Sequence, residues 1–159
     1  MRLQDKILLV TSAQNPCVKA IVTGFVREGA NCVVVDDDAA QAEKLAAEVR
    51  LLGRRALPLQ SDVTKKSQVE EIVRRAVTEF GRIDVLLNCS GITQANDFLN
   101  FTEEAFNQCI DRGPKAYFLT CQAVGRQMAE QRYLIRNRKI VIAGQMIIQL
   151  QRQTRTEDT

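Results

Sequence analysis

The chain has 159 residues, of which 45% are hydrophobic, and a formal net charge of +3. This length supports one sizeable core, so we expect a single domain. The basic excess lies wholly in residues 111–159, which carry 9 Lys and Arg against 4 Asp and Glu. With no histidine and no CxxC pair in the sequence, the usual zinc sites and the Ser-His and Cys-His mechanisms are excluded.

The cysteines are scattered along the chain and predict small, buried, apolar side chains in a reducing compartment. They are Cys17, Cys32, Cys89, Cys109 and Cys121. The apolar run near the start is too short for the core of a signal peptide. No stretch approaches the length needed to span a membrane. We therefore expect a cytoplasmic protein without a membrane partner.

Short apolar runs predict buried parallel strands in five places. The runs cover residues 6–10, 32–35, 55–60, 85–87 and 139–144. Pro58 indicates an irregular or edge-exposed end of the third strand, because proline cannot donate to a strand ladder.

Segments with helical apolar spacing separate these strands. Residues 16–29, 39–53 and 67–81 each end in a glycine, which is typical of a helix C-terminus. Residues 102–131 predict one long helix opened by Thr102 and interrupted at its centre by the sequence RGP. The alternation predicts an α/β fold, a doubly wound parallel sheet of the Rossmann type with about five strands. We expect this domain over residues 1–145 and a polar tail over residues 146–159.

Three motifs follow the predicted strands. An acidic residue, Asp36, closes the second strand, Asp62 and Val63 follow the third, and Asn88 and Gly91 form an Asn-x-x-Gly turn after the fourth. In type and spacing these motifs resemble the short-chain dehydrogenase/reductase family over roughly residues 3–144. That family transfers hydride between NAD(P) and a carbonyl or alcohol carbon.

The resemblance implies a role for each motif in cofactor binding. Asp36 would accept the ribose hydroxyls of the adenosine half and repel a 2′-phosphate, which favours NAD over NADP. Asp62 and Val63 would lie against the adenine ring. The turn from Asn88 through Ser90 to Gly91 would lie beside the nicotinamide half.

Plain structural roles stand beside these assignments. Asp36 and the two acids after it suit the entry of a helix, where negative charge is favourable. Asp62 would serve as a turn residue, and Asn88 as a side chain that ends a strand by hydrogen bonding.

The first strand-to-helix loop departs from the family pattern Thr-Gly-x-x-x-Gly-x-Gly. Thr11 matches, but Ser12, Pro16 and Val18 replace the three glycines. These glycines provide the tight turn, the close approach of the pyrophosphate and close packing of the helix on the sheet. We therefore expect bulk at these positions to spoil the phosphate site, so that NAD binds weakly or not at all.

The loop residues nevertheless suit a helix without ligand. Asn15 can cap the helix, and Pro16 fits its first position. Any residual cofactor contacts in this loop would come from Ser12, Asn15 and Cys17.

The catalytic residues of the family are missing. The family uses a Tyr-x-x-x-Lys pair, because an unperturbed tyrosine with a pKa of about 10 needs a nearby cation to act near neutral pH. Tyr117 is followed four places later by Cys121, and Tyr133 by Asn137. Gly113 stands where the resemblance places the relay asparagine, and no serine follows Ser90. We assign no catalytic residue and no metal ligand.

Three interpretations remain. In the first, the chain is a catalytically incompetent, C-terminally truncated relative, since such domains commonly run near 250 residues. It would bind a partner through its bared sheet edge and the helix at 102–131, as a homo-oligomer or a hetero-oligomer with a family member. In the second, it is an oxidoreductase subunit completed by another family chain. In the third, the basic stretch 126–139 binds nucleic acid, which we do not favour because aromatic residues for base stacking are scarce there.

Overall fold

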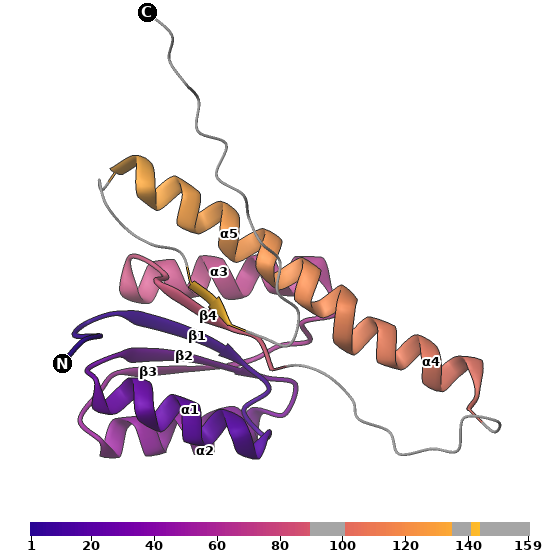
Figure 1. The fold of residues 1–159 in the computed structure, drawn as a ribbon, viewed down its shortest axis with the longest axis horizontal. Helices are drawn as coiled ribbons and strands as arrows, with labels where there is room; N and C mark the ends of the chain where they lie inside the picture. The colour runs from indigo at the N-terminus through magenta and orange to yellow at the C-terminus, as the bar shows by residue number, and fades with distance from the viewer. Residues whose placement is uncertain (90–100, 135–140, 144–159) are drawn as a thin grey trace, which may run out of the picture.

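The computed structural model describes residues 1–89, 101–134 and 141–143, and the expected tail 146–159 lies outside these ranges. The elements alternate as expected, and Figure 1 shows them in chain order. The strands are β1 (Ile7–Thr11), β2 (Asn31–Asp36), β3 (Ala56–Gln60), β4 (Val85–Leu87) and β5 (Val141–Ala143). The helices are α1 (Pro16–Arg27), α2 (Ala39–Leu51), α3 (Lys66–Phe80), α4 (Glu103–Ile110) and α5 (Ala116–Leu134), with a π-helical turn, η2 (Asp111–Lys115), between the last two.

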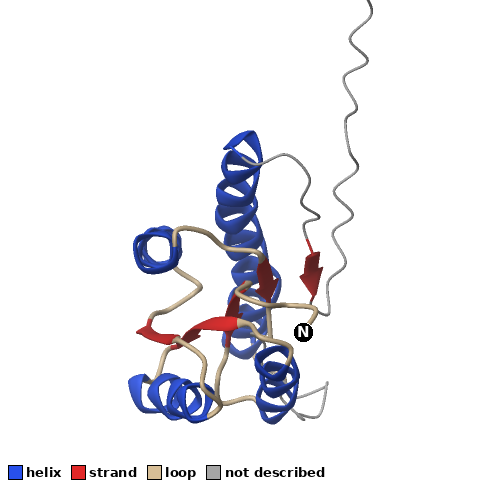
Figure 2. Cartoon of the chain, turned by 90° about the vertical axis from the view of Figure 1, so that its left-hand side faces the viewer, coloured by secondary structure: helices blue, strands red, loops and turns tan. Residues whose placement is uncertain are grey.

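The strands form one parallel sheet in the order β3-β2-β1-β4-β5. Helices α1 and α2 cover one face, and α3 and α5 cover the other, as Figures 1 and 2 show. This arrangement confirms the predicted doubly wound, Rossmann-type fold. It also places β3 at an edge, where Pro58 can lie without breaking a central hydrogen-bond ladder.

The alternation of side chains along the strands builds two cores. Leu8 and Val10 of β1 point into the core beneath α1 and α2, whereas Ile7 and Leu9 point into the core beneath α3 and α5. All five residues of β1 are buried, as expected for a central strand covered on both faces. The sheet therefore fixes where the loops at its carboxyl edge begin.

Two helix ends follow the sequence expectations closely. The Asn15 side chain accepts the Cys17 N–H at the start of α1, and the Thr102 hydroxyl accepts the Ala105 N–H at the start of α4.

Gly29, after α1, has a φ of 98° and lies so close to the backbone of Gln4 that an added Cβ would come within 2.9 Å of the Gln4 Cα. A side chain at residue 29 would force the N-terminal segment away.

The long helix differs from its prediction in one respect. The RGP sequence does not break it but widens it into η2, so that α4 and α5 run on as one rod. Pro114 lacks the N–H that an α-helix would donate to the carbonyl four residues earlier, and a π-helical turn accommodates the missing bond. Arg112 lies in this widened turn.

Candidate cofactor site

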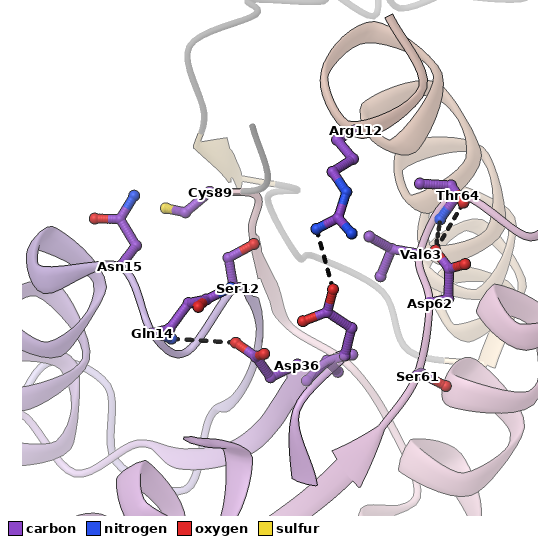
Figure 3. Close-up of a pocket in the computed structure, with 12 residues that line it drawn as sticks. Ser12, Gln14, Asn15, Asp36, Ser61, Asp62, Val63, Thr64, Cys89 and Arg112 are labelled. Atoms are coloured by element: carbon purple, nitrogen blue, oxygen red, sulfur yellow. Dashed lines mark hydrogen bonds and ion pairs between the residues drawn. The ribbon is translucent and has the colours of Figure 1, made fainter. Parts of the chain in front are cut away.

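The loops at the carboxyl ends of β1, β2 and β3 surround a cavity of about 300 Å³. This edge of a doubly wound sheet is where such folds bind ligands. Five residues predicted from the sequence line it together: Ser12, Asn15, Asp36, Asp62 and Val63. Figure 3 shows them around a common space. The topology therefore brings residues 50 positions apart into one site.

The other predicted residues are placed differently. The Cys17 side chain is exposed on α1 and does not line the cavity. Asn88 is buried, with 1% of its surface exposed, and does not line the cavity. Ser90 and Gly91 lie outside the described residues. Their proposed cofactor contacts remain predictions.

Further side chains that the sequence did not single out complete the lining. They are Gln14, Val35, Asp37, Ser61, Thr64, Cys89 and Arg112. Most of them are direct neighbours of predicted residues, so their position near the end of a strand could have indicated that they line the cavity. Arg112 comes from η2, far along the chain, and no sequence pattern indicated it.

The amide groups of the first loop are used within the protein. The Gln14 N–H donates to Asp36 Oδ2 at 3.1 Å, and the Asn15 N–H donates to the Ser12 carbonyl at 3.1 Å. The Cys17 N–H donates to Asn15 Oδ1 at 3.0 Å, and the Val18 N–H to the Asn15 carbonyl at 2.9 Å. Proline at residue 16 has no N–H. Between residues 14 and 18, no amide hydrogen is left over for a phosphate at this helix N-terminus.

Val18 acts differently from the sequence expectation. Its side chain is fully buried in the core with Leu8, Val10 and Val22 rather than projecting toward the cavity. The expectation that its bulk would occupy the phosphate position is wrong. Helix α1 packs against the sheet through Val18, so the third glycine of the family pattern has become a core position.

Ser12 occupies the first glycine position and takes the backbone conformation that favours glycine. Its φ is 60°, a left-handed value shared by one other non-glycine residue in the described ranges, Asp5. An L-residue pays roughly 1–2 kcal/mol for this conformation. The loop therefore keeps the glycine-type turn while carrying a side chain that strains it.

Ser12→Gly is expected to raise the free energy of unfolding by about 0.5–1 kcal/mol. Relief of strain of roughly 1–2 kcal/mol exceeds the entropy cost of a glycine, about 0.5–1 kcal/mol. Urea unfolding of both proteins measures the difference. Ser61→Gly is the matched control, because Ser61 lines the same cavity without a positive φ and should lose stability instead. A loss of stability in Ser12→Gly would contradict the strain argument.

Asp36 is held by the loops on both sides. Its Oδ2 accepts the Gln14 N–H, and its Oδ1 accepts the Asp38 N–H at 3.0 Å. Only 3% of the residue is exposed. Burial raises the pKa of Asp36 although these two N–H groups oppose the shift. The carboxylate therefore organises the turn after β2 and the first loop at the same time.

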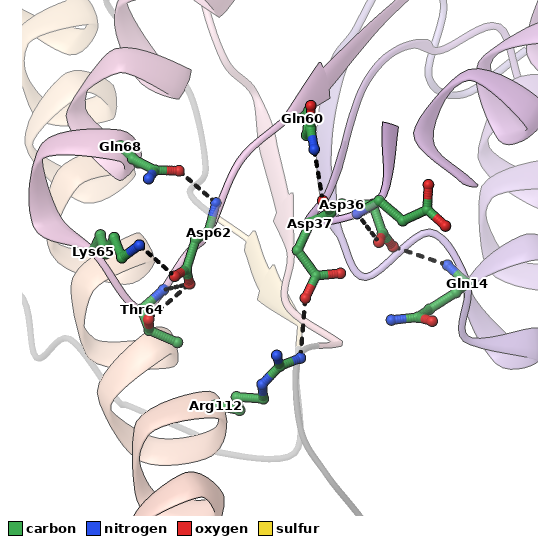
Figure 4. A network of polar contacts seen from close by, with 10 residues as sticks. Gln14, Asp36, Asp37, Gln60, Asp62, Thr64, Lys65, Gln68 and Arg112 are labelled. Carbon is green, nitrogen blue, oxygen red and sulfur yellow. Dashed lines mark hydrogen bonds and ion pairs between the residues drawn. The ribbon is translucent and has the colours of Figure 1, made fainter. Parts of the chain in front are cut away.

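Asp62 orders the turn between β3 and α3, as Figure 4 shows. Its Oδ1 accepts the Thr64 N–H at 3.0 Å and the Thr64 hydroxyl at 2.7 Å, and Lys65 Nζ lies 3.4 Å from Oδ2. Burial raises the pKa of Asp62, but the Thr64 hydrogen bonds and the Lys65 cation outweigh it and lower the pKa below 3.8. The ionised form is thus the one that the folded state stabilises.

Asp62→Asn is expected to cost about 1 kcal/mol at pH 7. Because the folded-state pKa lies below the ordinary 3.8, this stability is fully present above pH 3.8 and is lost as the pH falls further. Chemical unfolding of both proteins at pH 7 and at pH 2.5 should show the difference shrinking toward zero in acid. An equal difference in the free energy of unfolding at both pH values would show that the charge of Asp62 does not cause the stabilisation.

Asn88 belongs to a buried hydrogen-bond network that joins β1, β4 and α5. Its Oδ1 accepts from Thr120 Oγ1 at 3.0 Å and from Thr11 Oγ1 at 3.4 Å. The Tyr117 hydroxyl donates to the Asn88 carbonyl at 2.8 Å. Tyr117 is 7% exposed and does not line the cavity. In this arrangement the tyrosine anchors α5 to the end of β4.

No group of three or more metal-ligating side chains occurs within the part of the chain that the structure describes. The five cysteines are free thiols. Burial raises the pKa of both Cys89 and Cys121, so these thiols remain protonated near neutral pH. Among the described helices, none is long and apolar enough to cross a bilayer.

Comparison with known proteins decides the family. The sequence profile described as short chain dehydrogenase matches residues 6–134. The chain belongs to the short-chain dehydrogenase family. It is similar to the 3-oxoacyl-[acyl-carrier-protein] reductase of Thermotoga maritima, with 33% identity covering 83% of this chain and 54% of the relative.

Further relatives support the same assignment. The chain is 30% identical to the 2-dehydro-3-deoxy-D-gluconate 5-dehydrogenase of Dickeya dadantii, over 81% of this chain and 50% of that enzyme. It also superimposes on the crystal structure of a short-chain type dehydrogenase/reductase from Mycobacterium marinum, with a TM-score of 0.79 and 28% identity, over 88% of this chain and 56% of the other. The chain spans about half the length of the curated relatives it matches.

Proposed function

We propose that this chain is a short-chain dehydrogenase-like protein that lacks hydride-transfer activity by itself and binds NAD weakly. The family reaction is NAD(P)-dependent transfer of hydride between a carbonyl and an alcohol. One observation carries the proposal: the Gln14, Asn15, Cys17 and Val18 amides already donate within the protein. A pyrophosphate would have to displace those bonds to be bound.

The acidic residues at the carboxyl edge of the sheet favour NAD over NADP in any residual cofactor binding. Asp36, Asp37 and Asp62 all line the cavity, and a 2′-phosphate there would meet several like charges. Val63, which the family resemblance assigns to the adenine ring, lines the same cavity. We infer that affinity resides in the adenosine half and that the pyrophosphate contributes little.

The positions of Tyr117 and Lys115 support the absence of activity. Tyr117 is buried against the Asn88 carbonyl, and Lys115 pairs with Asp111 at 2.8 Å on the surface of η2. Neither lines the described cavity. With no serine after Ser90, this chain supplies no complete acid–base set.

The test is NAD(H)-linked turnover with simple ketones and alcohols, followed by absorbance at the nicotinamide band. The purified chain is expected to show no turnover above the rate without protein. Turnover by the chain alone would overturn the proposal. Turnover that appears only when a full-length family member is added, and exceeds that of the added protein, would support the alternative of a subunit completed by another chain.

A second role is favoured by the surface of the long helix. Phe106, Ile110 and Phe118 are 53%, 41% and 52% exposed, and spacings of four and eight residues put them on one side of the rod. Exposed apolar side chains in line favour association with a partner. We infer a homo-oligomer or a hetero-oligomer with a family member through residues 102–131. Size-exclusion chromatography with light scattering should show a dimer or larger, and a monomer at all concentrations would contradict this role.

The state of the cysteines bears on the cell compartment of the protein. Free thiols at all five cysteines suit a reducing compartment, so we propose a cytoplasmic location. Neither a nucleic acid nor a membrane is proposed as a partner.

A further inference from the structure

A second cavity, of about 370 Å³, lies at the amino edge of the sheet. Its lining comes from segments that precede or begin strands: Asp5 and Ile7, Asn31, residues 53–55, and Phe80 at the end of α3. Figure 1 shows this edge at the left, on the side where the N-terminus is marked. The cavity shares no lining residue with the candidate cofactor site at the carboxyl edge. A ligand bound here would therefore lie apart from a dinucleotide.

Asn31 brings an unused donor to this cavity. The residue is only 8% exposed, and its Oδ1 accepts the Arg55 N–H at 3.0 Å, which fixes the orientation of the side-chain amide. Within the part of the chain that the structure describes, Asn31 Nδ2 has no hydrogen-bond acceptor, and it is not fully enclosed. Side-chain amides buried to this degree normally have partners. The N–H groups of Asn31 Nδ2 are thus available to an acceptor in the cavity.

Arg54 is the second donor with unused capacity. Its side chain is 19% exposed, and among the described residues it pairs with one carboxylate, Asp5, whose Oδ1 lies 2.6 Å from Nη2. Arg54 Nε is buried without a partner, and Nη1 has no acceptor in the described ranges either. The Asp5 side chain is 70% exposed, and an ion pair with so open a carboxylate is weak. The guanidinium therefore keeps the capacity to bind a second anion.

The rest of the lining suits an anion as well. With two arginines and one aspartate, the lining is positive overall, and Arg55 lies 4.8 Å above the Phe80 ring. Helices α2 and α3 end at this edge, where free carbonyl groups would repel an anion. Here the Arg50 carbonyl accepts the Gly53 N–H at 2.9 Å, and the Glu79 carbonyl accepts from Arg55 Nη2 at 3.3 Å. These bonds reduce the repulsion from the two helix ends.

We propose that the cavity at the amino edge binds the phosphate group of a small molecule through Arg54 and Asn31. A phosphate accepts several N–H bonds at once, and a planar guanidinium can supply two of them. Asp5 opposes binding, because its charge competes for Arg54 and repels the anion. Ile7 and Phe80 border the same space and would contact the organic part of a phosphate ester.

The test is a titration of the isotope-labelled chain with inorganic phosphate, at an ionic strength held constant with chloride, followed by NMR of the amide groups. The side-chain signal of Asn31 and the backbone signals of Gly53 and Arg54 should shift and saturate at millimolar phosphate. Arg54→Gln should weaken binding by about tenfold or more, as expected for a lost hydrogen bond to a charged group. Asn31→Asp should also weaken it, because this change keeps the oxygen that Arg55 needs but replaces the donor with a charged oxygen.

Asp5→Asn is expected to act in the opposite direction. It removes the charge that competes for Arg54, so phosphate should bind about threefold more tightly, the value of a weak exposed ion pair. Asparagine also tolerates the left-handed φ of 56° at this residue. A gain of affinity could not arise from a loss of the fold.

Arg74→Gln is the matched control for Arg54→Gln. The Arg74 side chain is 66% exposed and pairs with Glu71 on α3, but it does not line the cavity. Its replacement removes the same charge and should leave the affinity for phosphate unchanged. Phenyl phosphate then distinguishes the source of the phosphate group: tighter binding than inorganic phosphate supports an ester, and equal or weaker binding supports free phosphate.

Several outcomes would overturn the inference. Shifts that never saturate, or that are confined to residues 12–17 at the carboxyl edge, would remove the site from the amino edge. Unchanged affinity in Arg54→Gln, or weaker binding in Asp5→Asn, would contradict the roles given to these residues. None of these results bears on turnover or on NAD, so the proposed function is tested separately.

Discussion

Val18→Gly is expected to lower the free energy of unfolding by about 3 kcal/mol, even though it restores a glycine of the family pattern. Val18 is fully buried in the core beneath α1. Removing such a side chain costs about 1.5–3 kcal/mol of burial. A glycine inside a helix costs about 1 kcal/mol more. Thermal or urea unfolding of the two proteins measures the loss.

Gly24 offers the control for Val18, because it lies in the same helix with nothing within 4 Å of an added Cβ. Gly24→Ala should raise the free energy of unfolding by about 0.5–1 kcal/mol through helix propensity alone. The two substitutions should change the free energy of unfolding in opposite directions. This difference distinguishes the packing of the Val18 side chain from the helix propensity of α1. If Val18→Gly were neutral, the assignment of Val18 to the core would fail.

Asn15→Ala combined with Pro16→Gly is expected to strengthen NAD binding by about 10- to 100-fold. The first change releases the Cys17 N–H from Asn15 Oδ1, and the second supplies an N–H that proline lacks. Each donor can then bind a phosphate oxygen, and a hydrogen bond to a charged group is worth about 1.5–3 kcal/mol. Part of this is offset because the pyrophosphate still meets a strained turn at Ser12.

The control for the loop variant is Asn15→Ser, which keeps an oxygen able to cap the helix. It should leave NAD affinity within about twofold of the wild type, measured by titration to millimolar NAD. The double variant should also lose about 1 kcal/mol of stability with the cap. Equal affinity in the double variant and the wild type would show that engaged amides are not what limits binding.

Much of the fold could be predicted because its signals are local. Five apolar runs, three helices closed by glycines and the caps at Asn15 and Thr102 each express a preference of the residues present. The parallel order followed from their alternation, since right-handed crossovers leave few topologies. The turn at Pro114 was recognised as an interruption, but its π-helical form was not predicted, because a proline can also kink or end a helix.

The candidate site could be predicted only in part. Ser12, Asp36 and Asp62 were found because each lies at or just after the carboxyl end of a strand, and a parallel sheet brings these ends together. The direction of Val18 could not be read from the pattern, because it depends on how α1 rotates against the sheet. The approach of Arg112 to Asp37 joins elements 75 residues apart, and such contacts leave no periodic signal.

The central claim is that the amide hydrogens of Gln14, Asn15, Cys17 and Val18 already donate within the protein, so these groups contribute little to binding the pyrophosphate of a dinucleotide. Isothermal titration calorimetry of the cofactor-stripped wild-type chain with NAD tests it most directly. We predict a dissociation constant weaker than about 1 mM, corresponding to less than about 4 kcal/mol of binding free energy. A dissociation constant in the nanomolar to low micromolar range would contradict the account.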